Sequence, residues 1–110
     1  MTSVFVSVPM NGRTRDEWEE ERDGLLKKAK DILKEDARLV PNCIDPDLSP
    51  LERQGESLKR MGGADYVVFS PEWRKARGCC IEHMCALEYG VRYLSPTAIL
   101  RGWRDSDGRN

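Results

Sequence analysis

The stretch VFVSVP, residues 4–9, decides the fold class of this chain. Its apolar run is interrupted only by Ser7, ends at Pro9, and is rich in β-branched valine. A short, nearly continuous apolar run is typical of a strand that is buried on both faces of a parallel sheet. We therefore expect the first strand at residues 4–8.

The residues that follow this strand predict a long amphipathic helix. Thr14 and Glu17 have the spacing of a capping box, in which each side chain bonds the backbone N–H of the other residue. Apolar residues then recur at helical spacing and should pack on the sheet: Trp18, Leu25, Leu26, Ala29, Ile32 and Leu33. The charged residues of this helix are interpreted as a solvated face: Glu17, Glu19, Glu20, Glu21, Arg22 and Asp23.

The next segments continue the alternation of strand and helix. Residues 37–41 (ARLVP) predict a weak second strand, and residues 42–50 are rich in Asn, Asp, Pro and Ser, which is typical of a loop. Ser49 and Glu52 form a second capping box, with proline at the first helical position. A short second helix is therefore expected, ending near Met61.

The C-terminal half predicts one more helix between two strands. Residues 65–69 (DYVVF) are β-branched and aromatic and are bounded by turn residues, which favours a third strand. The third helix is expected at residues 78–89, with Gly90 as its stop. The last strand is either residues 91–94 or residues 97–100, and the pattern does not separate them.

Strands that alternate with helices imply right-handed crossovers and a parallel sheet covered by helices on both faces. The chain has 110 residues, 39% of them hydrophobic, which fits one compact domain. We expect that domain at residues 1–104, followed by a polar tail at residues 105–110.

Composition excludes several classes of protein. A formal net charge of -1 gives no general attraction to nucleic acid. No apolar run is long enough to span a bilayer and the N-terminal residues lack a secretory signal, so a cytoplasmic protein with no membrane partner is expected. The four cysteines should then remain thiols rather than form disulfides: Cys43, Cys79, Cys80 and Cys85.

In an open parallel sheet, ligands bind beyond the carboxyl ends of the strands, where the strand order reverses. Residues 9–13, 42–49 and 70–78 are the loops expected at that edge. Glu82 lies about one turn inside the helix that leaves the third loop, so it could point at the same crevice. The positive end of the helix suits an ionised carboxylate there, either as a nucleophile or as a group that only stabilises the helix.

On a helical wheel, the third helix has two distinct faces. The predicted apolar stripe consists of Cys80, Met84 and Leu87. A separate ridge consists of Gly78, Glu82, Ala86 and Gly90. The small residues on this ridge would let another backbone or a ligand approach Glu82 closely.

Three segments in this order resemble the nucleoside 2-deoxyribosyltransferase-like superfamily, especially its branch of small bacterial and phage proteins. They are VFVSVPMNGR (residues 4–13), ADYVVFSPEW (residues 64–73) and GCCIEHMCALEYG (residues 78–90). The third segment, with G-x-x-x-E-x-x-x-A-x-x-x-G spacing after a tryptophan-containing loop, is the most specific. The resemblance implies a flavodoxin-like (Rossmann-like) three-layer α/β sandwich with a four- or five-stranded, mainly parallel sheet.

Active members of that family cleave or exchange the N-glycosidic bond of a deoxynucleoside or its monophosphate. The resemblance implies that Glu82 is the nucleophile, which attacks the anomeric carbon and forms a glycosyl-enzyme ester while a second acid assists the departing base. The expected substrate pocket includes Phe5, Met10, Asn11, Gly12, Arg13, Trp73 and Gly78. The expected partners are a small-molecule nucleoside or nucleotide and a second copy of the chain, since family members usually form dimers. No metal or organic cofactor is required.

Three departures from the family pattern favour an alternative function. Phe5 stands where tyrosine is usual and cannot donate the hydrogen bond that would orient the nucleophile. Ser57 stands where a proton-handling aspartate is expected, and serine cannot replace a carboxylic acid in that role. Ala76 stands where serine often contacts phosphate. The alternative is therefore a non-catalytic nucleotide-binding sensor or regulatory module.

Other candidate residues also have a structural interpretation. Residues 11–13 are of the types that any loop before a helix needs. Trp73 could stack on a base or anchor its loop against the core. Asp65 is interpreted as a cap at the start of a strand. Cys79 and His83 are four residues apart on one helix, which is too little to predict a metal site.

Overall fold

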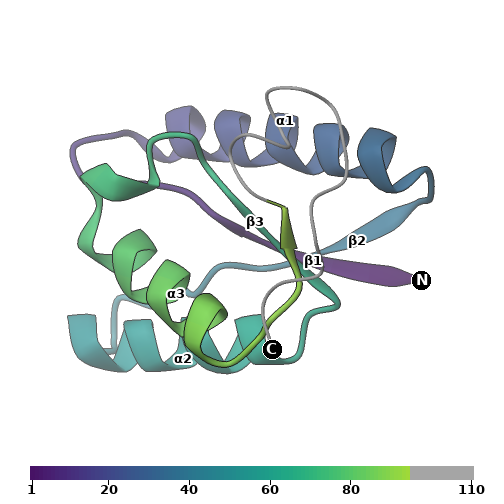
Figure 1. Ribbon diagram of the computed structural model, residues 1–110. Helices are drawn as coiled ribbons and strands as arrows, with labels where there is room; N and C mark the ends of the chain where they lie inside the picture. Colours follow the sequence, from purple (N-terminus) through teal and green to yellow (C-terminus); the bar gives the residue numbers. More distant parts are fainter. Residues whose placement is uncertain (95–110) are drawn as a thin grey trace.

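A computed structural model describes residues 1–94 of the chain (Figure 1). The strands and helices alternate in the order β1 (Thr2–Ser7), α1 (Arg15–Leu33), β2 (Ala37–Val40), α2 (Pro50–Gly62), β3 (Tyr66–Phe69), a 3₁₀ turn (Trp73–Lys75), α3 (Arg77–Glu88) and β4 (Tyr93–Leu94). The four described strands form one parallel sheet in the order β2-β1-β3-β4. The predicted α/β class is confirmed, and the strand order and layers are those of a flavodoxin-like sandwich.

The first strand is the centre of the sheet, as its apolar run predicted. β1 pairs with β2 on one side and with β3 on the other, and all its residues after Thr2 are buried. Because side chains alternate along a strand, Val4 and Val6 contact the α1 layer, whereas Phe5 and Ser7 face the opposite layer.

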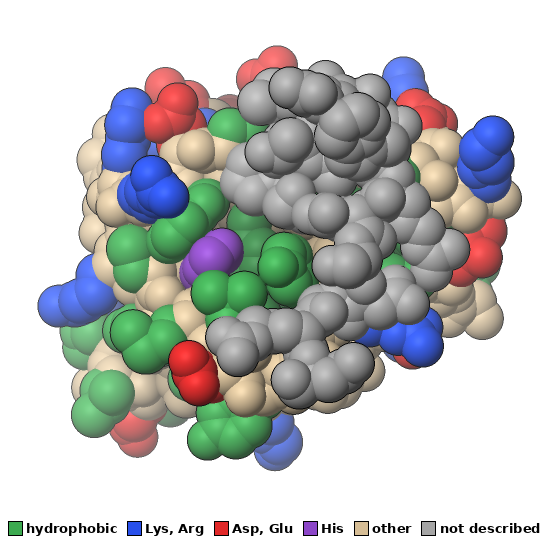
Figure 2. Space-filling view, viewed as in Figure 1, with side chains coloured by type: hydrophobic (Ala, Val, Ile, Leu, Met, Phe, Trp, Pro, Cys, Tyr) green, Lys and Arg blue, Asp and Glu red, His purple; other side chains and the backbone are tan. Residues whose placement is uncertain are grey.

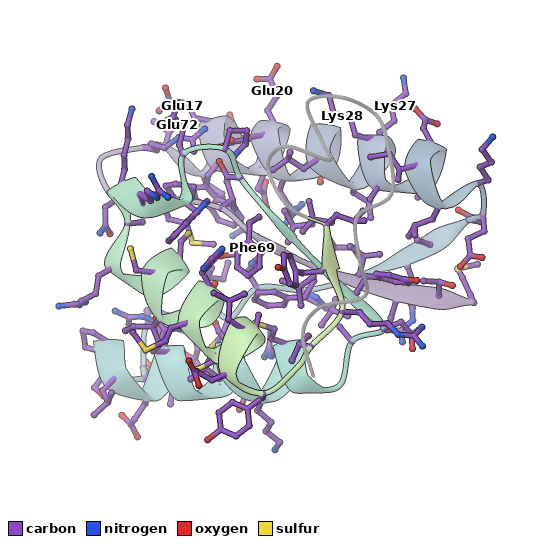
Figure 3. The ribbon with its side chains drawn as sticks, in the orientation of Figure 1. Glu17, Glu20, Lys27, Lys28, Phe69 and Glu72 are labelled. Carbon is purple, nitrogen blue, oxygen red and sulfur yellow. The ribbon has the colours of Figure 1, made fainter. Side chains whose placement is uncertain are left out.

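Among the described elements, helix α1 is the one that covers this first face of the sheet (Figure 1). It begins at the predicted capping box, in which the Thr14 hydroxyl accepts from the Glu17 N–H and the Glu17 carboxylate accepts from the Thr14 N–H. Its buried side chains pack with the valines of β1 and β3 in an entirely apolar cluster apart from one tyrosine: Val4, Val6, Leu25, Ala29, Leu33, Ala37, Tyr66, Val68 and Leu94. Glu20, Lys27 and Lys28 point away from the sheet, as a solvated face should (Figure 3).

Helices α2 and α3 cover the other face together (Figure 1). Their apolar cluster is smaller and contains Phe5, Met61, Val67, Phe69 and Ala86. Helix α2 begins at the second predicted capping box, Ser49 with Glu52. In Figure 3, Phe69 points from β3 into the layer between the sheet and α3.

The structure of residues 91–94 answers part of the question of where the last strand lies. Residues 91–94 contain a strand, the two-residue β4, which pairs with β3. Gly90 precedes it with a φ of 66°, the left-handed conformation that ends a helix and favours glycine. The alternative strand at residues 97–100 and the polar tail at residues 105–110 lie outside the described residues.

The predicted apolar stripe of the third helix is not its buried side. Met84, from the predicted apolar stripe, is 63% exposed. The buried residues are instead Cys79, Glu82 and Ala86. The reason is that Ala86 is small enough to pack directly on the sheet, and polar partners on β1 and α2 receive the buried carboxylate.

Candidate functional site

Glu82 is a buried carboxylate with two hydrogen-bond donors from two other elements. Its side chain is 8% exposed. Oε1 accepts from the Ser7 hydroxyl at 2.6 Å, and Oε2 accepts from the Gln54 amide Nε2 at 2.9 Å. Both carboxylate oxygens are therefore fixed in direction, one from the end of β1 and one from α2.

The electrostatics of this carboxylate are a balance of opposing effects. Burial raises the pKa of Glu82 above the ordinary value of 4.5, while the hydrogen bonds from Ser7 and Gln54 oppose that rise. A carboxyl group held in this way exchanges its proton at a higher pH than a surface glutamate. Once ionised, it has fewer water molecules to displace before it attacks an electrophile.

The sequence explains why these three side chains meet. Ser7 is the last residue of β1 and alternates onto the α2 and α3 face. Gln54 reaches Glu82 by passing close to Gly78, since a Cβ placed on Gly78 would lie 2.8 Å from the Gln54 Oε1. The small residue predicted to admit a close approach does so, and the group that approaches is the Gln54 side chain.

Glu82 lies in the wall of a cavity of about 200 Å³ at the carboxyl ends of β1 and β2. At roughly 30 Å³ per water molecule, that volume holds a group about the size of one sugar ring. Four predicted site residues line it: Met10, Asn11, Gly78 and Glu82. The cavity also brings in Ser57 and Ala76, the positions at which the sequence departs from the family pattern.

The other predicted site residues do not line this cavity. Phe5 is 0% exposed and lies in the apolar cluster under α3. Gly12 is exposed and has a φ of 73°, which its turn requires. The Arg13 guanidinium donates to the Pro9 carbonyl of its own loop at 2.9 Å and to the Glu21 carboxylate of α1 at 2.6 Å.

Glu21 departs from the predicted solvated face of the first helix. Its Oε1 pairs with Arg13 at 2.6 Å, and its Oε2 accepts from the Ser70 hydroxyl at 2.6 Å. Arg13 lies in the loop after β1, and Ser70 begins the loop after β3. One side chain of α1 therefore ties together the two loops that leave the centre of the sheet.

Trp73 makes its closest ring contact with protein rather than with an open pocket. Its ring lies 3.8 Å from that of His83 and nearly parallel to it, with an interplanar angle of 5°. His83 also makes an edge contact with Phe69, and the Arg74 guanidinium lies 5.2 Å from the Trp73 ring centre. Figure 2 shows the histidine among hydrophobic side chains on this face. Burial lowers the pKa of His83, helped by Arg74.

Asp65 and Cys79 do not take part in the Glu82 site as acids or nucleophiles. Asp65 accepts from the Ser3 backbone N–H at 2.8 Å, at the amino end of the sheet, which agrees with its structural interpretation. Cys79 lines the cavity, but burial raises the pKa of its thiol to about 12, so it stays protonated. Within residues 1–94, no group of three or more His, Cys, Asp or Glu side chains is placed to hold a metal ion.

Sequence reasoning missed three residues of this site. Ser7 carried a signal, because it is the single polar residue in the apolar run of the first strand. Asn42 lay in a loop expected at the crevice but was given no individual role; it lines the cavity and donates to the Val6 carbonyl at 2.9 Å. Gln54 carried none, since a glutamine on a largely polar helix has no distinctive pattern.

Comparison of the chain with protein-family models, curated proteins and solved structures gives no match. The family resemblance and the expected dimer therefore stay predictions. Among the described helices, none combines the length and the apolar composition needed to cross a membrane.

Proposed function

We propose that this protein is a nucleoside or nucleotide N-glycosidase, or a deoxyribosyltransferase-like enzyme, with Glu82 as its nucleophile. The observation that carries the proposal is the buried Glu82 carboxylate, held by Ser7 and Gln54 in the wall of a cavity the size of a sugar ring. A buried, oriented carboxylate beside an open pocket is unusual for a purely structural residue. The resemblance of the surrounding segments to the nucleoside 2-deoxyribosyltransferase-like superfamily supports the same chemistry.

The proposed reaction has two steps at the anomeric carbon of the sugar. A Glu82 oxygen gives an electron pair to that carbon as the C–N bond breaks, and the bonding pair leaves with the nitrogen of the base. Water or a second base then attacks the same carbon, which breaks the ester and restores the carboxylate. Two inversions give net retention.

Ser7 has the part that the family gives to tyrosine at the position of Phe5. Both residues lie on the same face of β1, and Ser7 donates its hydroxyl to Glu82 at 2.6 Å. Gln54 supplies a second donor. The departure at Phe5 therefore does not leave the nucleophile without an orienting group.

A non-catalytic nucleotide-binding module is the second candidate, and one observation favours it. Glu82 is the sole carboxylate among the described residues that line the cavity, and Ser57 lines it where the family would have an aspartate. The departing base would then have to take its proton from water, which slows the first step. A module that binds without cleaving needs no such proton.

The test is incubation of the protein with deoxynucleosides and their 5′-monophosphates, with free base measured by chromatography. Glu82→Gln is the control, because it keeps the shape of the side chain and removes the nucleophile. Release of base by the native protein and not by the variant supports the enzyme. Thermal stabilisation by the same compounds without release supports the binding module. If no compound releases base and none stabilises the protein, both candidates are overturned.

A further inference from the structure

Asn42 lines the cavity, and no described protein group satisfies its side-chain oxygen. Its Nδ2 donates to the Val6 carbonyl at 2.9 Å, which fixes the orientation of the amide. Its Oδ1 is buried, and among the buried side-chain polar atoms of residues 1–94 it is the one without a hydrogen-bond partner. The residue lines the same cavity as Glu82.

A buried acceptor of this kind constrains whatever enters the cavity. An acceptor that the protein leaves unpaired must be satisfied by water or by a ligand, because an unmade hydrogen bond is costly in a buried place. A ligand that displaces water from Asn42 Oδ1 and brings no donor loses affinity. The neighbouring Glu82 carboxylate is also an acceptor, so this part of the pocket selects for O–H or N–H groups.

The position of Asn42 indicates which part of a nucleoside it would contact. Its amide is anchored to Val6, one residue before Ser7, and Ser7 holds the nucleophile. In the proposed reaction Glu82 must touch the anomeric carbon, so the sugar is the part of the substrate closest to this strand end. The donors of a sugar are its hydroxyl groups.

We propose that Asn42 is a specificity-determining residue whose Oδ1 accepts a hydrogen bond from a ring hydroxyl of the sugar. This inference rests on the proposed function for the identity of the ligand, and it extends that function to the choice between sugars. A substrate that lacks the hydroxyl leaves Asn42 Oδ1 without a donor. Such a substrate binds more weakly, because an unpaired buried acceptor is costly.

The experiment compares ligands that differ by one hydroxyl. The probes are adenosine, 2′-deoxyadenosine, 3′-deoxyadenosine and 2′,3′-dideoxyadenosine, the matching cytidine series, and the 5′-monophosphate of each. Their dissociation constants are measured by calorimetry on the full-length Glu82→Gln protein, which cannot turn them over, with and without Asn42→Leu. Asp47→Leu is the matched control, since Asp47 lies in the same loop as Asn42 but is exposed and is not among the residues that line the cavity.

The expected result is a ratio of dissociation constants. Loss of one hydroxyl should weaken binding on the order of tenfold or more when Asn42 is present, and Asn42→Leu should bring the ratio close to one. The Asp47→Leu protein should keep the preference. Both dissociation constants in a ratio are measured on the same protein, so a change in the folded fraction of a variant affects both and cancels from the ratio.

The outcomes separate this inference from the proposed function. A hydroxyl preference that depends on Asn42, without base release by the native protein, supports the inference and contradicts the proposed enzymatic activity. Base release together with a preference that survives Asn42→Leu keeps the enzyme and overturns the inference. Equal binding of all sugars, or no binding in either series, also overturns it.

Discussion

The two faces of the sheet differ in what they bury. The face under α1 buries a continuous apolar cluster, in which the valines of β1 and β3 pack against Leu25, Ala29 and Leu33. The face under α2 and α3 buries a smaller apolar cluster and, beside it, the Glu82 carboxylate with its partners Ser7 and Gln54. One sheet thus carries a conventional core on one side and a buried carboxyl group on the other.

Within the 94 described residues, one face of the sheet mainly stabilises the fold, and the other face holds the proposed site. Burial of apolar area stabilises the α1 face, whereas a buried carboxylate opposes folding unless its neighbours compensate. Two hydrogen bonds to Glu82 compensate in part, since its pKa remains raised. A group kept at the expense of stability is a candidate for a function, and mutations on the two faces should therefore have opposite signatures.

The largest expected effect is the loss of activity in Glu82→Gln. If Glu82 is the nucleophile, as proposed, the base-release rate should fall on the order of 1,000-fold or more. The free energy of unfolding should instead rise at pH values above the folded pKa of Glu82, where the native protein would hold an ionised carboxylate in a buried place. The measurements are base release by chromatography and chemical denaturation, both over a series of pH values from acid to alkaline.

The pH dependence of that stability difference has a definite sign. The folded pKa of Glu82 is above 4.5, so the folded state binds this proton more tightly than the unfolded state. The stabilising contribution of the proton is fully present below about pH 4.5 and is lost as the pH rises through the folded pKa. The advantage of the Gln variant should therefore shrink on acidification. An advantage that grows toward acid pH would contradict a raised pKa.

The opposite signature is expected for Leu25→Ala on the α1 face. Leu25 is 5% exposed and lies in the apolar cluster, so the truncation leaves a cavity and should cost about 2–5 kcal/mol of unfolding free energy. Activity per folded molecule should be unchanged, because α1 packs on the sheet face opposite Glu82. The measurement is urea denaturation alongside activity normalised to the folded fraction. A selective loss of activity would show that the two faces are coupled.

The sequence predicted the α1 face more completely than the other face. The apolar run of β1, the capping box at Thr14 and the helical spacing of the apolar residues reveal where β1 and α1 begin and which residues pack. These signals required no knowledge of the partner elements. The orientation of α3 depended on partners far along the chain: Ser7 is 75 residues from Glu82, and Gln54 is 28 residues away. A helical wheel shows which residues share a ridge with Glu82, but it cannot represent the donors from β1 and α2 that meet this ridge.

The same limitation explains the outcome for the loop residues. The sequence predicted that Arg13 and Trp73 lie in loops at the edge of the sheet. It did not predict that Arg13 pairs with Glu21 and that Trp73 stacks on His83. Both partners lie on other elements, and neither had a pattern that pointed to this pairing.

Ser7→Ala should move the pH profile of activity. Removal of the hydroxyl takes away a donor that opposes the rise in the pKa of Glu82, so the pKa rises further and the acid limb of the base-release profile shifts to higher pH. At neutral pH the rate should fall roughly tenfold or more. Ser3→Ala is the matched control, since Ser3 is buried on the same strand and face but bonds Asp65 at the other end. A profile shifted equally by both variants would rule out a specific role for Ser7.

The smallest expected effect comes from Gly78→Ala, and it is the finest test of the α2 and α3 face. The new Cβ would lie 2.8 Å from the Gln54 Oε1, closer than such atoms approach, so the flexible amide must move and its bond to Glu82 is weakened. The rate of base release should fall roughly three- to tenfold, while the helix gains the higher propensity of alanine and stability does not fall. Gly55→Ala is the matched control, because Gly55 is also helical and a Cβ there meets nothing within 4 Å. Equal rates for the two variants would mean that Gln54 does not orient Glu82, and the buried carboxylate would then depend on Ser7 alone.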